Sequence, residues 1–215
     1  EELQHPWLNK SIETAQRRVE QYHFSIRKRT LEYDDVMNKQ REVIYGFRKK
    51  TLFDDDCRES IFDILEIETA RHLEEAIATA GTSSDSRDPL NKEMFLTWLN
   101  MTFPIGFKDD TIVLNGKGNV DEDKTIDAVL KRVNEMYEVK SSLESSPDAL
   151  KWLERHIILD AIDRLWQDHL RAMDDLRSSI GLRAYAQKDP LVEYKKEAFA
   201  MFDQLMNDID QEILS

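Results

Sequence analysis

The stretch from residue 9 to residue 52 constrains the fold of this chain more than any other part of the sequence. It contains no proline and only one glycine, Gly46, so nothing in it forces a helix to end. A helix of about 43 residues, at roughly 1.5 Å per residue, would extend about 64 Å. A rod of that length needs other elements, or a partner, packed along it. Asn9 or Ser11 is predicted to cap its first turn.

Large residues recur along this stretch at spacings of three and four, which predicts one packing face. The predicted face consists of Ile12, Ala15, Val19, Tyr22, Ile26, Tyr33, Val36, Val43 and Phe47. Arg29 and Gln40 interrupt it, and this favours irregular packing over a segment of homodimeric coiled coil, which stays open as the alternative.

Composition points to a largely helical protein that is a piece of something longer. The 215 residues are 40% apolar and 34% charged, with six Gly and five Pro. The single cysteine, Cys57, excludes an internal disulfide and fits a reducing compartment. No apolar run approaches the ~20 residues of a membrane-spanning helix. There is no signal peptide and the chain begins with Glu1 rather than Met, so we expect a fragment.

Charge is distributed unevenly along the chain, whose net charge is −13. Residues 10–52 carry eleven basic and six acidic residues, whereas residues 53–146 carry ten basic and twenty-one acidic residues. Nucleic-acid binding begins with neutralisation of phosphates, so this balance argues against a nucleic-acid partner and against an accessory domain of a nucleic-acid motor. The basic helix is expected to find its counter-charges within the protein or its missing parts.

The rest of the chain predicts an all-α fold. Further helices are expected from Asp54 or Asp55 as cap to about residue 80, over 89–101, over 122–143, over 147–179 and from Pro190 onward, after an Asp189 cap. The last two should form an antiparallel hairpin because a short connection joins them. The inward face of the 147–179 helix is predicted to hold Leu150, Leu153, Ile157, Ala161, Leu165, Leu170, Met173 and Leu176, with Trp98, Trp152 and Trp166 as further core residues.

Sequence motifs that would indicate catalysis, phosphate binding or metal binding are weak, and no catalytic residue is predicted. The sequence lacks the GxxxxGK[ST] phosphate loop, and Gly116-Lys117-Gly118 is interpreted as a turn after a short extended piece over 112–114. The five histidines never take metal-ligand spacing with Cys57, so no metal site is predicted. His156 lies one turn from Asp160 and His169 one turn from Leu165, and both histidines are interpreted as making ordinary helical hydrogen bonds rather than forming a site.

The hairpin connection is the one segment that a structural role does not explain. Residues 177–188, with the sequence RSSIGLRAYAQK, carry three basic residues, no acidic residue and several apolar side chains. A routine connector would be shorter and more polar. Arg177 and Arg183 could simply complement a helix C-terminus, but that leaves Leu182 and Tyr185 unexplained. Packing of Tyr185 between the hairpin arms stays open as an alternative.

Two segments resemble one protein family. Residues 165–202 are LWQDHLRAMDDLRSSIGLRAYAQKDPLVEYKKEAFAMF, and residues 26–45 are IRKRTLEYDDVMNKQREVIY. In this order, and together with HP at residues 5–6 and AQRRVE at 15–20, they resemble the carboxy-terminal helical region of SecA, the bacterial protein-translocation ATPase. The match covers some 90 residues; residues 53–146 match only by position and helical character. Ala184 stands where that family usually has Gly, which restricts the backbone at the tip.

The resemblance implies a division into three segments and a set of site residues. Residues 1–52 would be the long helix of a helical scaffold, residues 53–146 a helical wing, and residues 147–215 the scaffold continuation with a two-helix finger whose tip lies at about 180–189. Contact with polypeptide or channel would fall on Leu182, Arg183, Tyr185, Gln187 and Lys188. Coupling to motor domains would fall on Arg27, Glu32, Asp34, Asp35, Asn38, Gln40 and Arg41.

The resemblance also implies partners that the residues alone do not specify. The parent protein would use ATP and Mg²⁺ in motor domains absent from this chain, which itself would hold no cofactor. The partners would be a preprotein with its signal peptide, a SecY-type membrane channel, the nucleotide-binding domains of the same parent chain and, optionally, anionic lipid. The location would be the bacterial cytoplasm, peripherally associated with the inner membrane. Without the resemblance, the residues support only a helical interaction module, such as a free-standing coiled-coil adaptor.

Overall fold

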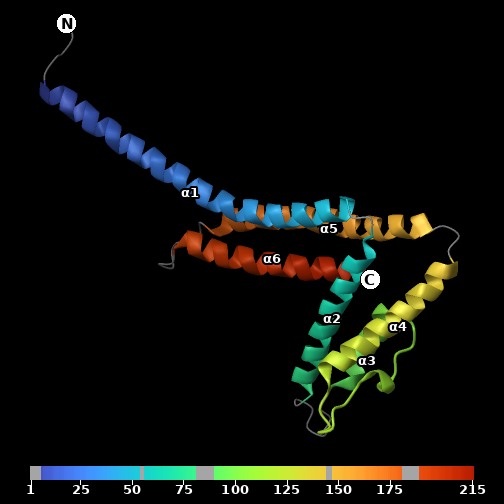
Figure 1. The fold of residues 1–215 in the computed structure, drawn as a ribbon. Helices are drawn as coiled ribbons and strands as arrows, with labels where there is room; N and C mark the ends of the chain where they lie inside the picture. Colours follow the sequence, from blue (N-terminus) through green and yellow to red (C-terminus); the bar gives the residue numbers. More distant parts are fainter. Residues whose placement is uncertain (1–5, 54–55, 81–89, 144–146, 181–188) are drawn as a thin grey trace. The chain divides into compact units, whose positions relative to one another are not determined.

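The computed structural model describes residues 6–53, 56–80, 90–143, 147–180 and 189–215, and these residues are almost entirely helical (Figure 1). The chain divides into two compact units, one of residues 1–47 and 166–204 and the other of residues 48–165 and 205–215. The prediction of an all-α fold is confirmed. The division into scaffold, wing and finger follows different boundaries from these units and stays a prediction.

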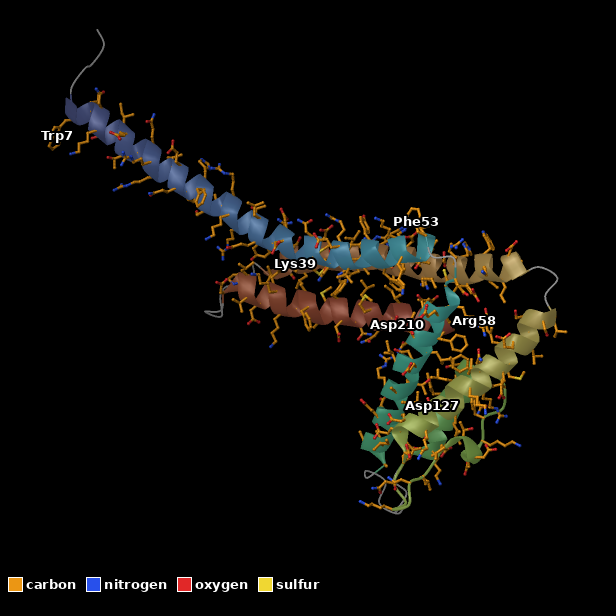
Figure 2. The ribbon with its side chains drawn as sticks, viewed as in Figure 1. Trp7, Lys39, Phe53, Arg58, Asp127 and Asp210 are labelled. Atoms are coloured by element: carbon orange, nitrogen blue, oxygen red, sulfur yellow. The ribbon has the colours of Figure 1, made fainter. Side chains whose placement is uncertain are left out.

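Helix α1, Pro6–Phe53, is a single helix of 48 residues. It begins before the predicted caps, so Asn9 and Ser11 lie inside it and the prediction of a cap there is wrong. The physical reason is Pro6, which has no N–H to satisfy and whose fixed φ suits the first helical position. In the first unit the early part of α1 runs clear of α5 and α6, with side chains projecting on all sides (Figure 2).

The second unit contains α2, Arg58–Thr79, α3, Lys92–Thr102, the short 3₁₀ helix η1, Asp109–Thr111, and α4, Glu122–Leu143. Its core is formed by Leu73, Ala76, Leu90, Phe95, Leu99, Phe107, Ile112 and Val129. The caps predicted at Asp54 and Asp55 lie outside the described residues, and Asp56 instead accepts a hydrogen bond from the Arg58 amide at 3.1 Å.

The glycine-containing segment at 116–118 is a turn, as predicted. Leu114 and Val120 form an isolated antiparallel bridge across it, and Asn115 accepts hydrogen bonds from the Lys117 and Asn119 amides. Gly118 has a φ of 81°, a conformation that favours glycine. The segment therefore closes on itself as a turn.

Helices α5, Pro147–Ile180, and α6, Pro190–Leu214, contribute to both units. Asp189 caps α6, as predicted, by accepting a hydrogen bond from the Leu191 amide at 2.8 Å. In the first unit the two helices run antiparallel and pack a core of Met173, Leu176, Ile180, Tyr194 and Ala198, against which Tyr33, Val36, Met37 and Met201 are half-buried. Here α1 packs on α5 and α6.

Two predicted packing faces were wrong in detail. On α5, Leu153 and Ile157 are exposed, while Ile158 and Ile162 are buried, a shift of one residue around the helix. Trp152, predicted as core, is 63% exposed and stacks on His156. A spacing of three and four does not determine which face of a 34-residue helix is buried, because α5 lies in the second unit up to residue 165 and in the first unit from residue 166.

On α1 the predicted face is exposed at Ile12, Val19, Tyr22, Ile26 and Val43, whereas Ile44 and the supposed interruption, Gln40, are buried.

Candidate functional site

The candidate site is the contact of α1 residues 33–44 with α5 and α6 in the first unit, called here the finger seat. At its centre lies Gln40, which is buried although polar. The Gln40 side-chain amide donates to the carbonyl oxygen of Ala198 at 3.0 Å, and its oxygen lies 3.0 Å from Nε2 of His169. One glutamine therefore joins α1 to both arms of the hairpin.

His169 has the protonation state that this arrangement needs. Burial lowers the pKa of its imidazole, which favours the neutral ring. Because the Gln40 oxygen can only accept, the neutral ring must carry its proton on Nε2 and donate. Trp166 stacks beside the ring at 5.5 Å between centroids, and Phe202 meets it edge-on at 5.9 Å. These aromatic contacts fix the imidazole plane.

A second contact lies toward the hairpin end of the seat. The rings of Tyr33 and Tyr194 are 4.8 Å apart, and Tyr194 is buried. The guanidinium of Arg177 lies 5.9 Å from the centre of the Tyr33 ring and donates to Asp34 at 2.9 Å. Burial raises the pKa of Tyr194, so its hydroxyl stays neutral at ordinary pH. This contact ties α1 to the arms close to where the tip departs.

Of the seven predicted coupling residues, the structure brings Gln40 and Asp34 into the seat. Arg27, Asp35, Asn38 and Arg41 are exposed, and Glu32 is half-buried. Three of these exposed residues make local pairs, Asp35 with Lys39 at 3.1 Å and Asn38 with Arg41 at 3.0 Å. Their role in coupling stays a prediction.

Sequence reasoning missed His169 as a contact between helices. The interpretation of an ordinary hydrogen bond within its own helix was wrong for this residue, since its ring reaches the side chain of Gln40, 129 residues away. The sequence contained one indication of this contact. Gln40 and His169 are polar residues that each occur within a pattern of large residues at helical spacing, on two different helices.

The predicted tip residues, Leu182, Arg183, Tyr185, Gln187 and Lys188, lie outside the described residues. The structure describes the two ends from which they depart, Ile180 and Asp189. Asp189 forms a long ion pair with Arg29 of α1 at 4.0 Å. Within the described ranges, no group of three or more His, Cys, Asp or Glu is placed to hold a metal ion.

Fold and site together define a class: a helical scaffold in which one long helix carries an antiparallel hairpin. The family model described as the SecA Wing and Scaffold domain matches residues 2–215. The chain belongs to the SecA family.

Curated relatives named protein translocase subunit SecA are similar to this chain over its whole length. That of Brachyspira hyodysenteriae is 42% identical over 215 residues, covering 100% of this chain and 21% of the relative. That of Chloroflexus aurantiacus is 40% identical over 212 residues, covering 99% of this chain and 20% of the relative. That of Chlorobium phaeobacteroides is 39% identical, with coverage of 99% and 20%. The chain thus spans about a fifth of the length of these relatives.

Proposed function

We propose that this chain is the mechanical scaffold and polypeptide-contacting finger of a SecA-type preprotein translocase ATPase. The observation that carries the proposal is the finger seat, in which Gln40 of α1 bonds to both hairpin arms. A movement of α1 would then move the arms as one body, because packed cores and bonded polar groups deform little. The seat is suited to delivering motion to the hairpin tip.

The source of that motion would be the nucleotide-binding domains of the same parent chain. From Trp7 to Leu31, α1 is exposed throughout the described structure and carries large apolar side chains, with Trp7 81% and Phe24 63% exposed. Soluble monomers rarely expose a continuous row of this kind, and such a surface marks an interaction site. Arg27 and the exposed polar residues beyond it, Asp35, Asn38 and Arg41, would extend the contact.

ATP and Mg²⁺ belong to the parent's motor domains in this proposal. We assign the hydrolysis step to those domains.

The hairpin tip would contact the preprotein, including its signal peptide, and a SecY-type channel. An aromatic residue such as Tyr185 suits a contact with many sequences, because it offers a large apolar area and loses little rotamer entropy. Arg183 and Lys188 would face backbone carbonyls or anionic lipid. The location would be the bacterial cytoplasm at the inner membrane; no described helix has the length and apolar character to cross a bilayer.

The rival, a free-standing coiled-coil adaptor, is not favoured by a family match over 214 residues. It predicts an obligate dimer through α1. Light scattering separates the two, because a highly helical monomer in solution would exclude the adaptor.

The proposal is tested by Tyr185→Ala in the full-length parent, with Tyr45→Ala as the matched control. Tyr45 is an exposed tyrosine of α1 outside both the seat and the 7–31 surface. Tyr185→Ala should impair preprotein transport into channel-containing vesicles and leave basal ATP hydrolysis near normal, while Tyr45→Ala should leave both unchanged. Intact transport in the Tyr185 variant would contradict the proposal.

A further inference from the structure

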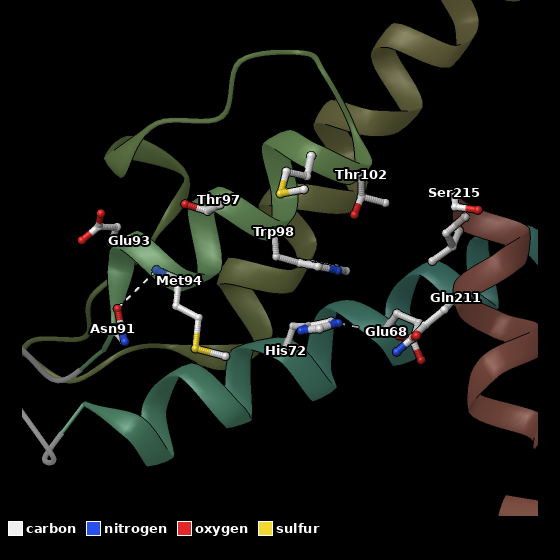
Figure 3. Close-up of a pocket in the computed structure, with 12 residues that line it drawn as sticks. Glu68, His72, Asn91, Glu93, Met94, Thr97, Trp98, Thr102, Gln211 and Ser215 are labelled. Carbon is white, nitrogen blue, oxygen red and sulfur yellow. Dashed lines mark hydrogen bonds and ion pairs between the residues drawn. The ribbon is translucent and has the colours of Figure 1, made fainter. Parts of the chain in front are cut away.

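The second unit contains a groove that the proposed function does not use. It has a volume of about 720 Å³, within the roughly 300–1,000 Å³ of ligand sites. Its walls come from α2, α3 and the last residues of α6 (Figure 3). The groove is open along one side, as a site for an extended chain needs to be.

The charged groups that line the groove are acidic. Glu93 stands exposed at the start of α3, and Glu68 lines the groove from α2; the lining includes no Lys or Arg. His72 also lines the groove, and burial lowers the pKa of its imidazole, which favours the uncharged ring. The groove therefore offers a ligand carboxyl groups and no lysine or arginine.

Glu68 has an unused hydrogen-bonding oxygen. Its side chain is 2% exposed, and Arg71 donates to Oε2. Among the described residues Oε1 has no hydrogen-bond partner. A buried acceptor left without a donor is destabilising, so an incoming donor would be stabilised there. Burial raises the pKa of Glu68, and a bound cation would favour its charged form.

The wall beside Glu68 is aromatic and apolar. The rings of His72 and Trp98 stack at 4.1 Å with 23° between their planes (Figure 3). Met94 and Met101 extend the wall, and Met101 is 80% exposed. A tryptophan face attracts guanidinium and ammonium groups, and methionine adapts to varied apolar side chains.

We propose that this groove binds a basic segment of a separate partner polypeptide. An arginine or lysine side chain would lie against Trp98 with its charge toward Glu68 and Glu93, and apolar neighbours in the segment would cover Met94 and Met101. The argument for this occupant is charge complementarity, since the groove has acidic groups and no basic one among its lining residues. The inference concerns α2 and α3 and does not depend on transport.

The test uses the full chain and a short dye-labelled peptide of alternating arginine and leucine, followed by fluorescence anisotropy. A peptide with glutamate in place of arginine is the ligand control. The variants are Glu93→Gln in the groove and Asp127→Asn, an exposed acid of α4 outside it. The basic peptide should bind, and Glu93→Gln should weaken binding by roughly fivefold while Asp127→Asn changes it by less than about twofold. Glu68→Gln should weaken binding of the basic peptide more than Glu93→Gln does.

Several results would overturn the proposal. Absence of binding at about 1 mM peptide would do so, as would equal losses in the groove variant and the α4 variant, which would mean general charge attraction. Equal affinity for the glutamate peptide would reduce the site to an apolar surface. Self-association of the chain that Glu93→Gln abolishes would assign the groove to a second copy instead.

Discussion

Gln40 is a buried polar residue whose side chain joins α1 to both arms of the hairpin. A buried amide is costly unless its donor and acceptor are both satisfied. Here the donor meets the Ala198 carbonyl and the acceptor meets His169, so the two bonds offset the cost of burial. Such a pair also fixes one register of α1 against the arms, because a sliding movement would leave both groups unpaired.

The lowered pKa of His169 predicts that the seat weakens in acid. The unfolded imidazole titrates near 6.5 and binds protons more readily than the buried ring, so protonation favours unfolding. The stabilising contribution of His169 should therefore be fully present above about pH 6.5 and decline as the pH falls below it. Unfolding in denaturant should be easier at about pH 5.5 than at about pH 7.5 for this reason.

The control for this prediction is His169→Gln. Asp210 has the opposite effect on stability in acid. Burial raises its pKa to about 6, so its protonation favours the folded state. The informative quantity is therefore the difference in pH slope between the parent chain and the variant. Equal slopes would mean that His169 is not the titrating group.

At the scale of elements, α1 is one helix with two environments. Its early part is exposed, and its later part packs on the hairpin arms in the first unit through Tyr33, Gln40 and neighbouring residues. Tertiary contacts rather than helix propensity stabilise most helices, so the later part should be the more stable. The exposed part is the one that we assign to the motor domains.

The contrast between the two parts is testable with the same substitution at two sites. Tyr33→Ala removes the ring contact with Tyr194 and should cost about 2 kcal/mol of unfolding free energy, below the value for a fully buried aromatic. Tyr22→Ala, at a site that is 64% exposed, should cost less than about 0.5 kcal/mol. Equal costs, measured by chemical denaturation, would contradict the assigned environments.

The helices themselves could be predicted from the sequence because their signals are local. Pro190 after Asp189 marks the start of α6, and the absence of Pro from residues 9–52 indicates α1. Which face of each helix is buried was harder to predict, because this depends on neighbouring helices that the periodicity of the sequence does not identify. On α5, for example, Ile158 is buried and Ile157 is not. On α1, Gln40 interrupts the apolar pattern of the sequence, and only the structure shows that it faces His169.

At the scale of the whole molecule, the proposal is that chemical energy released elsewhere in the parent reaches the finger through α1. A mechanical link of this kind has a distinctive failure: the motor continues to run while its output declines. The link can be weakened without touching the exposed surface of α1, because Gln40 is buried between the arms.

The most direct measurement is the amount of preprotein transported per ATP hydrolysed by the full-length parent carrying Gln40→Leu. Leucine removes both hydrogen bonds of the Gln40 side chain and leaves the proposed motor contact and the tip intact. Tyr45→Leu, at an exposed residue of α1 outside the seat, is the matched control. The ratio should fall by roughly fivefold or more in the Gln40 variant, in line with the loss of about 1–3 kcal/mol of bonding, and stay unchanged in the control. An unchanged ratio, or a parallel loss of transport and hydrolysis, would contradict the role of the seat.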